Sequence, residues 1–172
     1  MDNPGKAPWL IAIVALVLAG AFAFLWIGER DTSSDEIDSA LATEIPRAET
    51  TANEVILAIT NFDAQTFESV QDDLLPLTTG PFRADYQELL DAGLGEALEQ
   101  GAIDSTGEIV DGPYIGMSSS ERGVAVARVV QEVTSRATPG GRTVFMVLRL
   151  DLVKEGARWK ADSLDVLAQS TL

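Results

Sequence analysis

Two hydrophobic periods divide most of the chain. Between about residues 48 and 90, apolar positions recur every three or four residues, which predicts helices over about 48–62, 63–75 and 80–90. Past Gly101 the period becomes two, which predicts strands over about 103–115, 124–133, 143–153 and 158–167. Helices followed by hairpin-linked strands predict an α+β domain in which helices cover one face of a curved antiparallel sheet.

Individual residues predict where some of these helices and strands begin, bend or face the core. Pro81 after Gly80 suits the start of the third helix, because proline is favoured at the first helical position. Asp111-Gly112-Pro113 predicts a bulge or bend in the first strand. The alternation over 143–153 predicts one core face and one reverse face. The core face holds Val144, Met146, Leu148, Leu150 and Leu152, whereas Phe145 and Val147 are apolar on the reverse face.

A continuous apolar stretch precedes both periodic regions. Residues 9–27 carry no charged, amide or hydroxyl side chain, and as a helix they roughly match the ~30 Å hydrocarbon core of a bilayer. Trp9 and Trp26 stand at its ends, as expected of membrane-interface anchors. We predict a cytoplasmic stub over 1–8 and a transmembrane helix over 9–28. The alternative is a signal peptide cleaved at a small-x-small site near Ala21 or Ala23.

The orientation and the following linker complete the predicted layout. Lys6 and the short N-terminal tail favour an N-terminus inside, which places an extracytoplasmic domain over 48–172 on a single-pass protein of the cell membrane. Residues 29–47 form a linker or stalk, in which Ile37, Leu41 and Ile45 repeat every four residues until Pro46 interrupts or kinks the helix. The stalk either pairs with another helix, giving a homo-oligomer, or is a flexible tether.

Composition excludes several kinds of chemistry. The chain has no cysteine, so it forms no disulfide and no thiolate, and it has no histidine, the commonest general base and metal ligand. Its formal net charge is −15, which repels nucleic acid and anionic lipid headgroups. We therefore expect no nucleic acid partner, no cofactor and no metal site.

Few residues are candidates for a site. Asp72 and Asp73 are adjacent carboxylates, which point in different directions on a helix and so indicate a solvated face. Cross-strand ion pairs are predicted from Arg128 and Glu132 on one strand to Arg149 and Asp151 on its neighbour, and these would be surface pairs. The amphipathic aromatics either line a pocket between helices and sheet or belong to the core; they are Tyr86, Tyr114 and Trp159. No catalytic residue emerges, so the prediction is that the protein is not an enzyme.

Two segments resemble a known family. The run Leu77-Thr78-Thr79-Gly80-Pro81-Phe82-Arg83-Ala84-Asp85-Tyr86 and the turn Gly156-Ala157-Arg158-Trp159 are similar to motifs of the actinobacterial Mce-associated membrane proteins. The matching residues are Thr79, Gly80, Phe82, Tyr86, Gly156, Arg158 and Trp159. The resemblance implies a cone like that of nuclear transport factor 2, with helices cradling a bent sheet. From the residues themselves, Gly156 is expected at positive φ and Trp159 in the core.

The resemblance also implies a function. It predicts a non-enzymatic accessory or assembly subunit of an Mce-type lipid import system, with Mce transporter subunits or other envelope proteins as partners. One alternative is an inner-membrane component of a type IV secretion or conjugation apparatus. Another is a module that binds a lipid or small molecule, or a cryptic enzyme, in the cavity of the cone.

Overall fold

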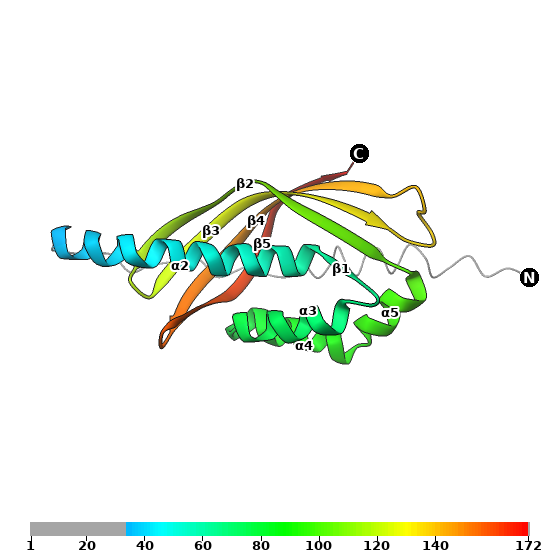
Figure 1. The fold of residues 1–172 in the computed structure, drawn as a ribbon, viewed down its shortest axis with the longest axis horizontal. Helices are drawn as coiled ribbons and strands as arrows, with labels where there is room; N and C mark the ends of the chain where they lie inside the picture. Colours follow the sequence, from blue (N-terminus) through cyan, green and yellow to red (C-terminus); the bar gives the residue numbers. More distant parts are fainter. Residues whose placement is uncertain (1–33, 172) are drawn as a thin grey trace, which may run out of the picture.

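The computed structural model describes residues 34–171 as helices packed against a curved antiparallel sheet, which confirms the predicted α+β class. Figure 1 shows the sheet arching over the long helix α2, with three short helices forming a layer below. In chain order the elements are α2 Ser34–Thr60, β1 Phe62–Asp63, α3 Phe67–Leu74, the 3-10 turn η1 Leu75–Leu77, α4 Gly80–Asp91, α5 Leu94–Gly101, β2 Asp104–Ser119, β3 Arg122–Thr134, β4 Arg142–Glu155 and β5 Arg158–Thr171. The strand order in the sheet follows the chain, β1-β2-β3-β4-β5, and every neighbouring pair is antiparallel, so the sheet is a meander.

The N-terminal predictions fall partly outside this region. No helix within residues 34–171 is long and apolar enough to cross a bilayer. The predicted membrane segment over 9–28, with Trp9 and Trp26, lies outside the described residues. It remains a prediction.

Helix α2 is longer than the sequence pattern predicts. It has 27 residues and continues through Pro46, so of the two predicted effects of this proline, interruption is wrong and a kink stays a prediction. The predicted domain boundary at residue 47 falls inside the helix. Pro46 lacks an N–H and removes one backbone hydrogen bond, and its side chain is exposed. The buried stripe Ala48, Ala52, Val55 and Ile56 then holds the helix against the sheet. Packing against the sheet thus stabilises the helix enough to continue through a proline that weakens it locally.

The inward face of β4 forms the centre of the core. Its five predicted residues, Val144, Met146, Leu148, Leu150 and Leu152, are all at most 7% exposed. They belong to one hydrophobic cluster with Ile56 of α2 and with Phe82 of α4. Phe67 begins α3 and packs edge-on against Phe62, with ring centroids 6.3 Å apart. The predicted packing of helices on this face is confirmed.

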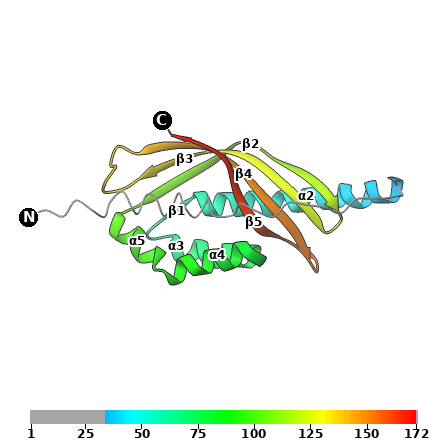
Figure 2. The same cartoon turned by 180° about the vertical axis from the view of Figure 1, so that it is seen from behind.

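The predicted bend in β2 is present. The register with β3 shifts on both sides of Asp111, and Gly112 has a φ of +87°. Seen from behind in Figure 2, the strands curve around the helical layer. The bulge contributes to this curvature and therefore to the hollow that the helices close.

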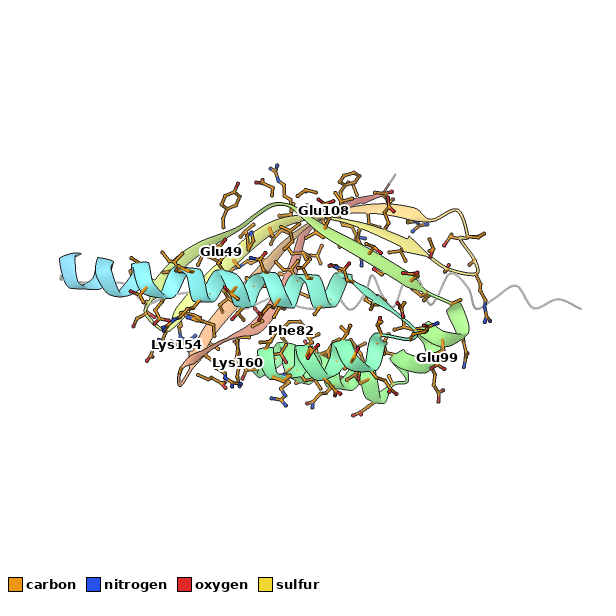
Figure 3. All side chains as sticks on the ribbon, in the orientation of Figure 1. Glu49, Phe82, Glu99, Glu108, Lys154 and Lys160 are labelled. Atoms are coloured by element: carbon orange, nitrogen blue, oxygen red, sulfur yellow. The ribbon has the colours of Figure 1, made fainter. Side chains whose placement is uncertain are left out.

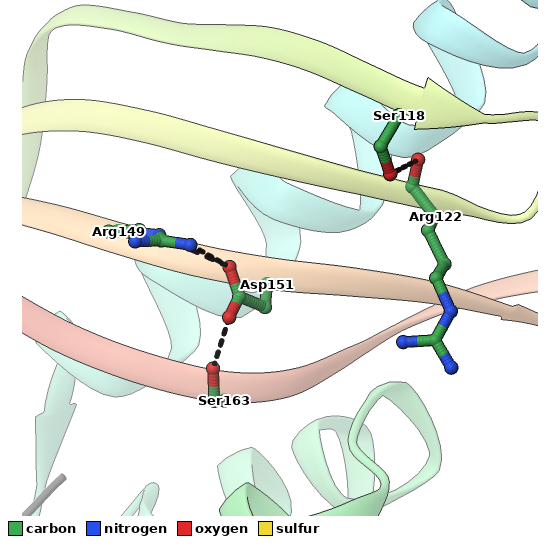
Figure 4. A network of polar contacts seen from close by, with 5 residues as sticks. All are labelled: Ser118, Arg122, Arg149, Asp151 and Ser163. Carbon is green, nitrogen blue, oxygen red and sulfur yellow. Dashed lines mark hydrogen bonds and ion pairs between the residues drawn. The ribbon is translucent and has the colours of Figure 1, made fainter. Parts of the chain in front are cut away.

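The predicted ion pairs between β3 and β4 are wrong. The register places Arg128 opposite Val147 and Arg149 opposite Val126, so no two oppositely charged side chains of the predicted set face each other across these strands. Arg128 instead lies 3.6 Å from Asp111 on β2. Arg149 bonds Asp151 on its own strand at 2.9 Å, and the Ser163 hydroxyl donates to the other oxygen of Asp151, as Figure 4 shows.

Candidate functional site

A cavity of about 100 Å³ lies between the helices and the concave face of the sheet and is partly open to solvent. Its walls come from the end of α2, from α3, α4 and α5, and from β1, β3, β4 and β5. Three lining residues are polar, and none is charged. The lining consists of Ala58, Ile59, Thr60, Phe62, Phe67, Val70, Phe82, Tyr86, Leu89, Leu94, Leu98, Gln131, Met146, Leu148 and Leu164.

The start of α4 positions two of these side chains. The Thr79 N–H donates to the Ala161 carbonyl at 2.9 Å, and the Thr79 hydroxyl donates to Glu155 at 2.6 Å. Gly80 follows with a φ of +52°, and a Cβ there would overlap the Asp162 carboxylate. Because α4 is thereby fixed against β5, Phe82 and Tyr86, four residues apart on one face, project into the cavity. Figure 3 labels Phe82 in the space between α4 and the core.

A buried polar cluster, formed by Thr60, Ser105 and Gln131, closes the cavity where α2 ends. The Ser105 hydroxyl donates to the Thr60 carbonyl at 2.7 Å. The Gln131 amide nitrogen lies 2.7 Å from Ser105 Oγ and 3.4 Å from the same carbonyl. These residues are between 2% and 7% exposed, so the cluster is shielded from bulk water. Thr60 and Gln131 are also cavity-lining residues.

The neighbouring residue fixes the same end of α2 to the sheet. Asn61 donates from its amide nitrogen to the Gly107 carbonyl and accepts from the Gly107 N–H, both at 3.0 Å. A Cβ on Gly107 would overlap the Thr60 side chain, so glycine permits this close approach of helix and strand. The wall that carries Thr60 and Gln131 is therefore anchored by hydrogen bonds as well as by packing.

Tyr86 supplies the other polar group of the cavity. Burial raises the pKa of its phenol to about 12, because the surrounding apolar side chains disfavour the phenolate. Tyr86 is therefore neutral at physiological pH and keeps its hydroxyl hydrogen as a donor. The lining thus offers neutral hydrogen-bonding groups within an apolar wall.

The three predicted pocket aromatics do not converge. Tyr86 lines the cavity, but Tyr114 is 65% exposed on the outer face, where its hydroxyl donates to Asp111. Trp159 is buried and donates from Nε1 to Glu44 at 2.9 Å, away from the cavity lining. Tyr114 shares the outward parity of the exposed residues Thr106 and Glu108 on β2.

The family-motif residues are structural in position. Gly156 has a φ of +63° in the β4–β5 turn and Trp159 is 3% exposed, which confirms both expectations. Arg158 is exposed at the start of β5. The two motif segments, far apart in sequence, meet where Thr79 bonds Glu155 beside this turn. Asp72 and Asp73 are exposed on α3, and no group of acidic residues within 34–171 is arranged to hold a metal ion.

Sequence reasoning missed the residues that give the cavity its polarity. Gln131 shares the inward parity of Ala125, Ala127 and Val129 on β3. Its position in the sequence could therefore have predicted an amide on the core face of the sheet. Ser105 and Thr60 gave no comparable signal, because their roles depend on contacts between the end of α2 and β2.

Three solved structures are similar to this chain. A crystal structure of an IcmL-like type IV secretion system protein from Legionella pneumophila matches with a TM-score of 0.51 and 16% identity over 72% of this chain and 90% of that chain. A putative scytalone dehydratase from Novosphingobium aromaticivorans matches with a TM-score of 0.53 and 10% identity over 77% and 90%. A hexachlorocyclohexane dehydrochlorinase matches with a TM-score of 0.48 and 11% identity over 81% and 93%.

Comparison of the sequence with protein-family models and with curated proteins gives no match, so membership of the Mce-associated family is not shown. The structural matches correct one prediction. The prediction that the protein is not an enzyme is contradicted, because a structure described as a putative scytalone dehydratase shares this fold. The fold is compatible with catalysis and does not decide it. At these identities the comparisons establish the architecture: residues 34–171 form a cone like that of nuclear transport factor 2.

Proposed function

We propose that this domain binds a small, largely apolar molecule in the cavity between its helices and its sheet. The observation that carries the proposal is the lining: twelve of the fifteen lining residues are apolar, and none is charged. Pockets for small ligands combine apolar walls with a few placed polar groups, which here are Thr60, Tyr86 and Gln131.

The cavity size limits the ligand. A dry engineered cavity of ~150 Å³ binds benzene, so a partly open cavity of about 100 Å³ suits a single ring or a short branched chain. Each buried CH₂ group contributes about 0.8 kcal/mol, so such a molecule gains affinity mainly from burial. A charged ligand would lose its hydration with no opposite charge on the cavity wall.

Methionine NMR tests this proposal at the site itself. The chain has three methionines, of which Met146 lines the cavity and Met117 lies near the β2–β3 turn outside the lining. We expect p-xylene, added to the isotope-labelled full chain in lipid nanodiscs, to shift the Met146 methyl signal saturably. The Met117 signal is the internal control for partitioning into lipid.

Two matched variants distinguish binding in the cavity from binding elsewhere on the protein. Ala58→Phe places a ring in the cavity and should abolish the saturable shift, whereas Ala42→Phe on the exposed face of the same helix should not. No saturable Met146 shift in the unmodified chain, or equal shifts in both variants, would contradict ligand binding at this site.

A second candidate function is assembly with envelope proteins. It is supported by the likeness of fold to an IcmL-like type IV secretion system protein and by apolar side chains on the outer face: Tyr114, Phe145 and Leu167 are 40–65% exposed. We propose a single-pass membrane protein with its domain outside the cytoplasm, serving either an Mce-type lipid importer or a secretion apparatus. Its partners would then be Mce transporter subunits or components of that apparatus.

Crosslinking in intact membranes distinguishes these assembly roles. Photoreactive groups placed at Phe145 and, as a control, at Glu99 on the helical side should give different partner sets. Identification of lipid-import subunits or of secretion components from Phe145 alone would favour the corresponding role. Identical products from both positions would argue against the outer face as a docking surface.

A further inference from the structure

The Thr60–Ser105–Gln131 cluster fixes the orientation of the Gln131 amide. The Thr60 carbonyl can only accept, so the Ser105 hydroxyl must donate its hydrogen to it. Ser105 Oγ then has only lone pairs to offer its second partner. The group 2.7 Å away must be the Gln131 amide nitrogen, since the amide oxygen has no hydrogen to donate.

This orientation leaves one acceptor unused. Both bonds of the Gln131 side chain are made by its nitrogen, and its Oε1 accepts none within the described residues. No fully buried polar side-chain atom in that region lacks a partner, so Oε1 is not sealed in the core. Gln131 is only 7% exposed and lines the cavity, which is the opening in contact with its side chain.

An unused acceptor in an apolar enclosure discriminates between ligands. A ligand that places a hydroxyl or N–H against Oε1 gains a shielded hydrogen bond, while one without a donor leaves the oxygen desolvated and unpaired. A carboxylate ligand would meet this oxygen as a second acceptor. Turning the amide would cost the cluster a hydrogen bond, because the single hydroxyl hydrogen of Ser105 cannot serve both the Thr60 carbonyl and the amide oxygen.

We infer that the cavity selects neutral, apolar molecules that carry a hydrogen-bond donor, such as a phenol or an alcohol, and that Gln131 Oε1 accepts that hydrogen. This inference rests on the proposed function and assigns its specificity to one oriented amide. Ser105 acts as a positioning residue for that amide.

The test uses two probes of nearly the same shape, 4-methylphenol and p-xylene, which differ by a hydroxyl in place of a methyl group. Affinities are read from the Met146 methyl signal of the full chain in nanodiscs. We expect Gln131→Leu to weaken 4-methylphenol about tenfold relative to p-xylene, the size of one lost shielded hydrogen bond. Gln87→Leu, at an exposed position on α4, should leave the ratio of the two affinities unchanged.

Ser105→Ala gives an independent readout of positioning. This variant removes the hydroxyl that orients the Gln131 amide but keeps the amide itself. We therefore expect the preference for 4-methylphenol over p-xylene to fall, while 4-methylphenol still binds. Binding of p-xylene with an affinity ratio that Gln131→Leu does not change would overturn the inference and leave the proposed function standing. Binding of neither probe would overturn both. The circular dichroism spectrum and the Met117 signal verify that each variant is folded.

Discussion

The indole nitrogen of Trp159 donates to a carboxylate oxygen of Glu44 at 2.9 Å, which joins the β4–β5 hairpin to the first half of α2. The other oxygen of Glu44 accepts from Lys154 Nζ at 2.7 Å, and Arg47 lies 3.3 Å away. Glu44 is 8% exposed and Trp159 is 3% exposed. Glu44, in the segment predicted to be a linker or stalk, is thus fixed to the domain by a shielded, charge-assisted contact.

Removal of the Trp159 side chain should destabilise the domain strongly. Trp159→Ala leaves a cavity in the core and deprives Glu44 of a donor, so we expect a loss of about 3–5 kcal/mol in the free energy of unfolding. Urea unfolding followed by circular dichroism measures this loss. Leu167→Ala, at a side chain 52% exposed, should change stability by less than about 0.5 kcal/mol. Equal effects would place Trp159 outside the core.

Glu44 should make stability depend on pH in the acid range. The hydrogen bond from Lys154, and next the one from Trp159, hold the pKa of Glu44 below its ordinary value of 4.5. Its contribution to stability is therefore complete above the unfolded-state pKa and is lost as pH falls through the lower folded-state pKa.

Glu44→Gln tests this linkage. We expect the variant to be less stable than the unmodified chain near neutral pH, with a difference that shrinks as the pH falls below about 4.5. Asp63, whose pKa is also lowered, remains in both proteins and cancels in the comparison. A stability difference that is constant from neutral to acid pH would show that the carboxylate charge of Glu44 has no role.

Gly80 should tolerate alanine less well than Gly156. Both have positive φ, so alanine at either position is strained by about 1 kcal/mol or more. At Gly80 a Cβ also overlaps the Asp162 carboxylate, whereas at Gly156 it meets no atom within 4 Å. Thermal unfolding should therefore show a larger loss for Gly80→Ala. Adding Asp162→Ala should recover the excess loss, and failure to recover it would show that the carboxylate is not the obstacle.

Tyr86 should lower stability at alkaline pH. Its folded-state pKa is raised from 10.0 to about 12, so the stability it contributes is present below about pH 10 and is lost as pH rises towards 12. The chain has two tyrosines, so phenolate absorbance of the Tyr114→Phe variant reports Tyr86 alone. A midpoint near 10 would show that the phenol is hydrated and not enclosed by the cavity. In the unmodified chain, a hydrogen bond to Asp111 also raises the pKa of Tyr114.

The sequence predicted those parts of the fold that local residues determine. Alternation identified the core face of β4, Gly80-Pro81 located the start of α4, and Gly156 indicated the β4–β5 turn. These features depend on side-chain period or on backbone angles that few residues adopt.

Features set by distant partners were not predictable in the same way. The burial of Glu44 depends on Trp159 and Lys154, which are more than one hundred residues away in sequence. The partner of Arg128 depends on register shifts in β2, and the orientation of Gln131 depends on the end of α2. A hydrophobic pattern shows which side of a strand is inward, but not which polar atom it meets there.

The double hydrogen bond between Asn61 and Gly107 has a mechanical consequence. It joins α2 and β2 into one rigid body, to which the Thr60–Ser105–Gln131 cluster adds β3. The opposite wall, from α3 to α5, is hydrogen-bonded to the sheet layer near both of its ends. Before α4 the Thr79 N–H donates to the Ala161 carbonyl and its hydroxyl donates to Glu155, and at the end of α5 the Gly101 carbonyl accepts from the Arg136 N–H. Any widening of the cone to admit a ligand is therefore expected between these attachments, and not in the wall that holds the Gln131 amide.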